Sequence, residues 1–160
     1  MIYNWWLFLH FVGIFAFLLA HGASVTVTFQ LRKERDPARI EALLQLSRGS
    51  LAAFYVGLAV LTTAGIILGF IPGSPGTWWG QGWIWTALAL LIAVSGAMIA
   101  LARPYYRRLE RAVQAWIGGS AAVSEAEIAQ LLTSRRPLVI AGLGFGGLLA
   151  ILWLMVLKPF

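Results

Sequence analysis

The sequence has no cysteine, only two histidines and few charged residues. The absence of cysteine excludes disulfides, thiolate metal sites, iron–sulfur clusters and a cysteine nucleophile. Charged residues make up 11% of the 160 residues, whereas soluble domains carry roughly a quarter because their surface must face water. Hydrophobic residues make up 60%. This composition predicts that much of the surface faces lipid.

Four apolar runs are long enough to cross a bilayer, which takes about 20 residues of helix. They cover residues 4–31, 50–70, 83–102 and 138–157. The first run lacks the basic segment that opens a signal peptide, so we expect it to remain as a span. The connections leave no room for a separate soluble domain. We therefore predict an all-α polytopic membrane protein, a single domain over 1–160 with four transmembrane helices bundled in the lipid bilayer.

Basic residues are confined almost entirely to two of the connections. Segment 32–49 holds five Lys and Arg residues and segment 103–137 holds six, together eleven of the 12 in the chain. Segment 71–82 holds no charge. The positive-inside bias makes the two basic segments cytoplasmic loops and 71–82 an outer loop, with both termini outside the cell inner (plasma) membrane. The net charge of +6 then reflects topology, and no nucleic-acid partner is expected.

The two basic loops also carry signals for short amphipathic helices. Asp36 and Pro37 predict an N-cap and a first turn, and this helix should end at Gly49, where the chain turns into the second span. After the third span a basic helix should stop at Gly118. A capping box at Ser124 then opens a second short helix. We expect these helices at the inner face of the membrane.

Small residues spaced four apart mark two of the spans. Gly65 and Gly69 lie in the second span, and Gly142 and Gly146 lie in the fourth. Such pairs let membrane helices approach closely. They predict either plain packing contacts within the bundle or a glycine-lined slot for a flat cofactor.

Both histidines lie in the first span, within LHFVGIFAFLLAHGAS. His10 and His21 are eleven residues apart, which returns an α-helix to within about 20° of its starting direction, so they share one face about 16 Å apart. Gly13, Ser24 and Thr28 lie on the same face. Because a polar group facing lipid has no partner, this stripe should face the bundle interior. No charged side chain lies inside any of the four spans.

Imidazole in an apolar, glycine-bearing helix is typical of haem b ligation. In this reading His10, His21 and Gly13 contact the cofactor, and the histidines are the ligand candidates for the haem iron. One helix cannot supply both axial ligands of one haem. Met155 of the fourth span lies at roughly the depth of His10 and is a candidate second ligand. Alternatively, a homodimer could supply the second axial ligand by pairing each histidine with the same histidine of the other copy. A five-coordinate haem would need no second ligand.

Two other readings of the histidines stay open. Each neutral imidazole can make one interhelical hydrogen bond, with Thr62, Thr63 or Ser95 as candidate partners. A soft or borderline metal site is the other reading, and it is the weaker one because two residues three turns apart cannot hold the same ion.

The opening LFLHFVGIFAFLLAHG, the following LRKERDPARIEALLQLSR and the four-span layout resemble a family of small bacterial membrane proteins, domain of unknown function 2269. The resemblance covers most of the chain and supports the four-span fold. The LH-x-x-G opening is more loosely similar to the first span of CopD-type copper-resistance membrane domains and of four-span haem-associated protoporphyrinogen oxidases. Only His10 and Gly13 carry over from these families.

No nucleophile, base and acid can be assembled into a catalytic set, so we expect no catalysis by the chain itself. We predict a small integral membrane protein that acts as a haem b-carrying or redox-associated subunit. The alternative is a purely structural accessory subunit of a larger membrane complex or a homodimer, packed through its glycine faces. A transporter of an uncharged small molecule is a third reading, since no intramembrane charge is present to recognise a charged substrate.

Overall fold

The structure, a computed structural model, describes residues 1–71, 78–120 and 123–160. Within these ranges the chain is helical and contains no β-strand, which confirms the all-α prediction. The helices, in chain order, are α1 (Ile2–Leu31), α2 (Pro37–Phe70), the short 3-10 helix η1 (Trp78–Gly80), α3 (Gly82–Ile117), α4 (Glu125–Thr133) and α5 (Arg136–Leu157). Residues 72–77 of the predicted outer loop lie outside the described residues.

Four helical segments of the described chain are long and apolar enough to cross a membrane: α1, α2, α3, and α5 with α4 before it. The four predicted spans lie within α1, α2, α3 and α5, respectively. The chain is therefore a small multi-pass membrane protein. Large apolar side chains point outward from the spans, as expected for helices in contact with lipid; Phe15, Leu19, Ile92 and Leu149 are examples.

The first predicted amphipathic helix is not a separate element, which corrects the boundary placed at Gly49. The helix α2 begins at Pro37 and continues through this glycine into the second span. A single glycine costs a helix only about 1 kcal/mol relative to alanine. The Ser50 hydroxyl donates to the carbonyl of Ser47 at 2.8 Å, so the serine does not interrupt the helix. Burial of Ile40 and Leu44 against other helices fixes the direction of this first part.

The predicted helix ends and caps at the other positions are confirmed. Ala38 donates its backbone N–H to Asp36 Oδ1 at 3.0 Å, which makes Asp36 the N-cap of α2. The helix α3 ends at Gly118, and Gly119 follows with a φ of +71°. Glu127 donates its backbone N–H to the Ser124 hydroxyl at 3.2 Å and so caps α4. These signals are local, which is why the sequence alone reveals them.

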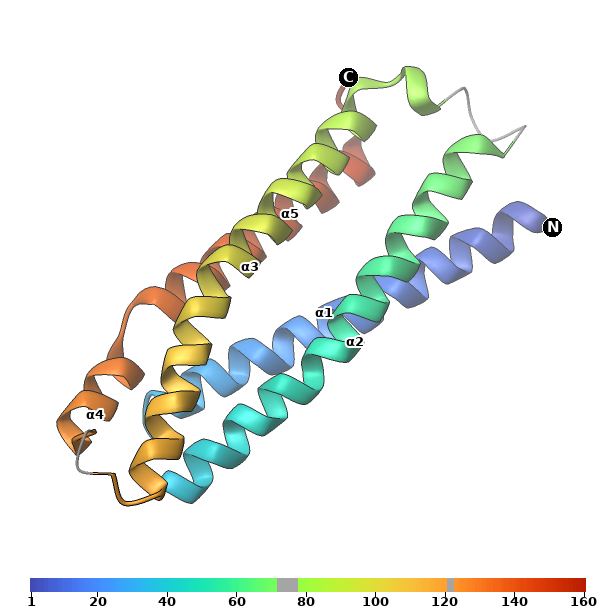
Figure 1. Cartoon of the computed structure of the whole chain (residues 1–160). Coiled ribbons are helices and arrows are strands. Elements are labelled where there is room, and N and C mark those ends of the chain that lie inside the picture. The colour runs from blue at the N-terminus through green and yellow to red at the C-terminus, as the bar shows by residue number, and fades with distance from the viewer. Residues whose placement is uncertain (72–77, 121–122) are drawn as a thin grey trace.

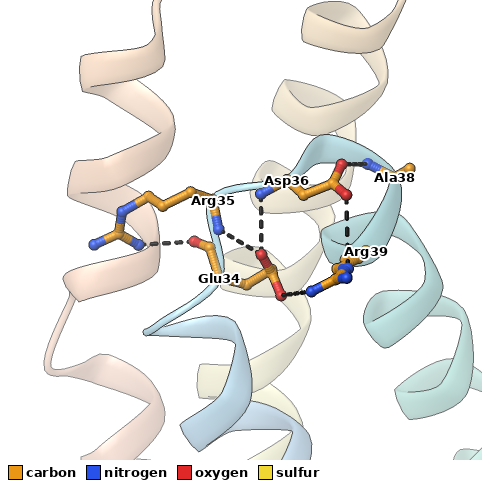
Figure 2. A network of polar contacts seen from close by, with 5 residues as sticks. All are labelled: Glu34, Arg35, Asp36, Ala38 and Arg39. Atoms are coloured by element: carbon orange, nitrogen blue, oxygen red, sulfur yellow. Dashed lines mark hydrogen bonds and ion pairs between the residues drawn. The ribbon is translucent and has the colours of Figure 1, made fainter.

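The turn between α1 and α2 is closed by a small polar network (Figure 2). Glu34 Oε1 accepts the backbone N–H of Arg35 at 2.8 Å and of Asp36 at 3.1 Å. Arg39 forms ion pairs with Glu34 Oε2 at 4.0 Å and with Asp36 Oδ2 at 3.7 Å. The backbone N–H groups of Asp36 and Arg35, and then the Arg39 guanidinium, lower the pKa of the Glu34 carboxyl below its ordinary value.

The helices are arranged as two close pairs, α1 with α2 and α3 with α5 (Figure 1). We call the end that carries α4 and residues 32–48 and 103–136 the basic end. Both chain termini lie at the opposite end, together with η1 (Figure 1). Glycine permits the close approach of α1 and α2. A Cβ on Gly13 would lie 2.5 Å from the Leu61 nitrogen, and one on Gly57 would lie 2.6 Å from the Phe17 nitrogen.

The largest cluster of buried side chains lies at the basic end and not between the spans. It contains ten buried residues from all five α-helices except α5: Val27, Leu31, Ile40, Leu44, Tyr105, Leu109, Ala112, Val113, Ile128 and Leu132. Two clusters between the spans contain four buried residues each. Burial away from water is favourable at about 25 cal/mol per Å² of apolar area, whereas lipid tails are as apolar as leucine and give no such drive. The pairs are thus joined mainly at the basic end.

Candidate functional site

The predicted polar stripe of α1 faces the bundle interior. Gly13, His21 and Thr28 are buried, and His10 and Ser24 are half-buried. The orientation predicted from helical periodicity is confirmed. The two histidines have different surroundings, however, and only one of them has a hydrogen-bond partner.

His10 bonds to the backbone of α2, at 2.7 Å from Nδ1 to the carbonyl oxygen of Leu61. The partner is thus a main-chain carbonyl and not one of the predicted hydroxyls. Gly65 makes this contact available, because it lies one turn after Leu61 and has no side chain above the carbonyl. A Cβ there would lie 3.1 Å from His10 Cε1. A carbonyl only accepts, so Nδ1 carries the proton and Nε2 keeps its lone pair.

His21 lies where α1 meets α5 and is 4% exposed. Its ring is stacked on Phe17, with centroids 6.4 Å apart, and meets the edge of Phe145 at 5.2 Å. A Cβ on Gly144 would lie 2.6 Å from His21 Cε1 and 2.8 Å from Nε2, so only glycine leaves room for the imidazole. Nε2 is buried and makes no hydrogen bond. A buried polar atom without a partner costs about 1–3 kcal/mol.

The glycines predicted to mark close packing in the fourth span divide into two sets. Gly142 and Gly146 are exposed, and a Cβ on either would meet no atom within 4 Å. Gly144 and Gly147 face the interior, against His21 and Val94 respectively. The contacts of α5 within the described bundle are therefore made by the second set.

Gly13 and Met155, the other candidate haem contacts, lie in different helix pairs. The space beside Gly13 is filled by the backbone of Leu61 in α2. Met155 packs beside the buried cluster of Trp83, Ala87, Ile151 and Leu154, which belongs to the α3–α5 pair. His10 belongs to the other pair, where it bonds to Leu61 of α2.

The two histidines differ in how well their surroundings suit a haem ligand. Metal-bound histidines usually donate their other ring N–H to a carbonyl or carboxylate, and the His10–Leu61 bond is of this kind. Around His21, Gly144 of α5 packs against the edge of the ring that carries Nε2, and this nitrogen is buried. A metal ion bound about 2 Å from that nitrogen has no space there. His10 therefore fits a haem ligand, and His21 bonded through Nε2 does not.

A cavity of about 430 Å³ lies beside His21 and extends toward the basic end. We call it the His21 cavity. Its walls come from α1, α2, α3 and α5, and most of the lining is apolar, as at Leu51, Phe54 and Ile140. On one side the polar stripe continues along α1 as Ser24 and Thr28. The cavity therefore joins an apolar interior to a charged edge.

Hydroxyl groups in the cavity wall bond to one another. Ser24 Oγ lies 2.9 Å from Ser50 Oγ. Thr28 Oγ1 donates to the carbonyl of Ser24 at 3.0 Å and lies 2.8 Å from the Tyr106 hydroxyl, which can donate to it. A tyrosine just after a membrane span is typical of an interfacial anchor, so the sequence gives no specific signal for this role of Tyr106. Unlike these hydroxyls, the Nε2 atom of His21 has no hydrogen-bond partner among the described residues.

The described residues of this site offer the features of a binding site. Within the described residues no group of three or more His, Cys, Asp or Glu side chains could hold a metal ion. No hydroxyl of the cavity lies within hydrogen-bond reach of the His21 ring as a nucleophile would. What the cavity offers is an apolar volume with a few polar groups at fixed places.

Comparisons with protein-family models, with curated proteins and with solved structures find no match for this chain.

Proposed function

We propose that this membrane protein is a ligand-carrying subunit without catalysis of its own, and that its ligand occupies the His21 cavity. The observation that carries the proposal is that His21 lines this cavity with hydrogen-bonding capacity that no protein group uses. A ring nitrogen without a protein partner beside an apolar cavity favours a ligand that can bond to it. Because α5 covers Nε2, the ligand would bond to Nδ1.

The size and chemistry of the cavity support this role. Small-molecule sites in proteins measure about 300–1,000 Å³ and combine an apolar lining with a few placed polar groups. The His21 cavity has about 430 Å³ and this kind of lining. A matching ligand has an apolar body and one hydrogen-bonding group that reaches the imidazole. Such an amphiphile reaches the site from the membrane.

Filling the cavity tests the proposal. Ala141 is buried in its wall on α5, so Ala141→Phe should occupy the space of the ligand. Gly142→Phe is the matched control, because the neighbouring position faces open space. Each variant is purified in mild detergent, and amphiphiles extracted from it are quantified by mass spectrometry per mole of protein. We expect one class of molecule to be depleted by Ala141→Phe alone.

Equal amounts of every extracted molecule in both variants would contradict the proposal, provided that both variants are folded. Helical circular dichroism and a single size-exclusion peak check folding. If Ala141→Phe fails this check, Ala102→Phe fills the same cavity from α3. The structural-subunit alternative predicts no depleted molecule and a protein partner that survives mild detergent. The transporter alternative predicts movement of the extracted molecule across a vesicle membrane.

Haem b at His10 is the second candidate, because the Leu61 carbonyl holds His10 in the tautomer that leaves Nε2 free to bind iron. Haem would give the subunit an electron-transfer role. A reduced-minus-oxidised visible spectrum of the purified protein tests this. We expect a b-type band that His10→Ala abolishes and His21→Ala retains. A featureless spectrum from folded protein whose cofactor was not stripped during purification would exclude this candidate.

The membrane orientation also belongs to this proposal, as does the resemblance to the four-span bacterial family. Eleven of the 12 Lys and Arg residues lie at the basic end. The positive-inside bias places this end in the cytoplasm and both termini outside the plasma membrane. Because the chain has no cysteine, a cysteine introduced at exposed Ala42 reports on the basic end. It should react with an impermeant maleimide only after the cells are opened.

A further inference from the structure

The His21 cavity opens sideways between α2 and α3. The lining residues from α1 and α5 are buried or half-buried. The exposed ones come from α2 and α3, and they are Arg48, Leu51, Tyr55, Arg103 and Arg107. Leu51 and Tyr55 lie in the second span, and the three arginines lie just beyond the spans. The entrance therefore lies at the boundary between the lipid tails and the headgroups.

Two of the three arginines at this entrance have no partner in the described chain. Arg48 forms an ion pair with Glu110, at 2.7 Å from Nη2 to Oε2. The side chains of Arg103 and Arg107 make no ion pair or hydrogen bond with any described residue. They lie four residues apart on α3, so they are neighbours on one side of the helix. The entrance thus carries two uncompensated positive charges.

We propose that Arg103 and Arg107 hold the phosphate of an anionic phospholipid whose first chain segments enter the His21 cavity. This inference rests on the proposed function, because it names the ligand class for the same site. The planar guanidinium group matches two oxygens of a phosphate at once. Basic groups at this depth meet the negatively charged lipid surface. The sideways opening lets the remaining chains stay in the bilayer.

The lining favours a lipid over a free phosphate ion as the source of the anion. Directly behind the arginines, the walls are formed by apolar side chains such as Leu51, Phe54 and Ile140. A free ion gains nothing from such walls, whereas an acyl chain fills them. The ester region of the lipid then lies along the polar side of the cavity at His21, Ser24 and Tyr106, where an ester carbonyl would accept the hydrogen bond of His21 Nδ1.

The test is a native mass spectrometry titration of the delipidated, detergent-purified full chain with phosphatidylglycerol, and with phosphatidylcholine for comparison. Arg103→Gln/Arg107→Gln should weaken phosphatidylglycerol binding about tenfold, which is about 1.4 kcal/mol. The matched control is Arg135→Gln/Arg136→Gln. It removes the same charge from exposed positions of the basic end that do not line the cavity, and it should leave the binding unchanged.

Three outcomes overturn the inference. Equal weakening by both double variants would show that only general surface charge attracts the lipid. No weakening by Arg103→Gln/Arg107→Gln would remove the arginines from the site. Displacement of phosphatidylglycerol by inorganic phosphate at equal concentration would make the free ion the ligand.

The proposed function fails separately. It falls if Ala141→Phe and Gly142→Phe bind both lipids as the wild type does and carry the same extracted molecules. If Arg103→Gln/Arg107→Gln leaves lipid binding unchanged while Ala141→Phe reduces it, the ligand still occupies the cavity. In that case the inference that the arginines hold its headgroup is wrong.

Discussion

Replacing Gly13 with alanine should force α1 and α2 apart at one of their points of close approach. The new Cβ would lie 2.5 Å from the Leu61 nitrogen and 2.8 Å from its Cα. Carbon atoms pack best at about 3.5–4.0 Å, so the two backbones must separate by roughly 1 Å. These neighbours are backbone atoms, which cannot rotate out of the way as the end of a side chain can.

The size of the effect follows from three contributions. Overpacking of this kind costs about 1–3 kcal/mol. Separation also weakens the hydrogen bond from His10 to the Leu61 carbonyl, which contributes about 0.5–1.5 kcal/mol. Alanine offsets about 1 kcal/mol because it favours the helix more than glycine does. We expect the free energy of unfolding to fall by about 2 kcal/mol in Gly13→Ala.

Gly22→Ala is the matched control in the same helix, since its Cβ would meet no atom within 4 Å. It should leave the free energy of unfolding unchanged or raise it. The assay is equilibrium unfolding in mixed detergent micelles, followed by circular dichroism. If Gly13→Ala and Gly22→Ala have the same stability, α1 and α2 do not touch through their backbones at Leu61, and the reasoning is refuted.

Two further predictions concern the turn after α1 and the cavity wall. Folding lowers the pKa of Glu34. Its ionised carboxylate therefore stabilises the fold at any pH above the pKa of an unfolded glutamate. This stabilisation is lost as the pH falls through the lower pKa of the folded state. Thermal unfolding midpoints measured against pH should therefore fall more steeply on acidification in the wild type than in Glu34→Gln, and identical slopes would contradict this. Tyr106→Phe removes the bond to the Thr28 hydroxyl and should cost about 1 kcal/mol in the micelle assay. Tyr55→Phe, in the same cavity but without a hydrogen bond from its hydroxyl, should cost nothing, and an equal loss in both would show that the Tyr106 bond does not stabilise the fold.

The parts of the fold that depend on local sequence were predictable. Runs of apolar residues define the spans, and Asp36 and Ser124 cap helices through atoms only two or three residues away. The continuity of α2 through Gly49 was not predictable from the same signals. It depends on packing of Ile40 and Leu44 against distant helices, which overrides the weak local preference of one glycine.

The candidate site shows the same division. Helical periodicity alone placed His10 and His21 on one interior face. Their partners depend on which helices pair and in what rotation. The Leu61 carbonyl is accessible only because Gly65 lies across from His10, and His21 meets Gly144 rather than the more regular pair at Gly142 and Gly146. Depth counting likewise matched Met155 to His10 without regard to the pairing of α5 with α3.

The location of the core explains why the His21 cavity lies at the boundary of the basic end. Water drives burial there, so this end holds α1, α2, α3 and α4 together, while the spans beyond it rely on packing alone. Leu44 belongs both to this core and to the lining of the His21 cavity. The cavity therefore begins where the strongly held part of the bundle ends. A ligand bound there fills the space between the α1–α2 pair and the α3–α5 pair, and it does so without disturbing the close packing within either pair.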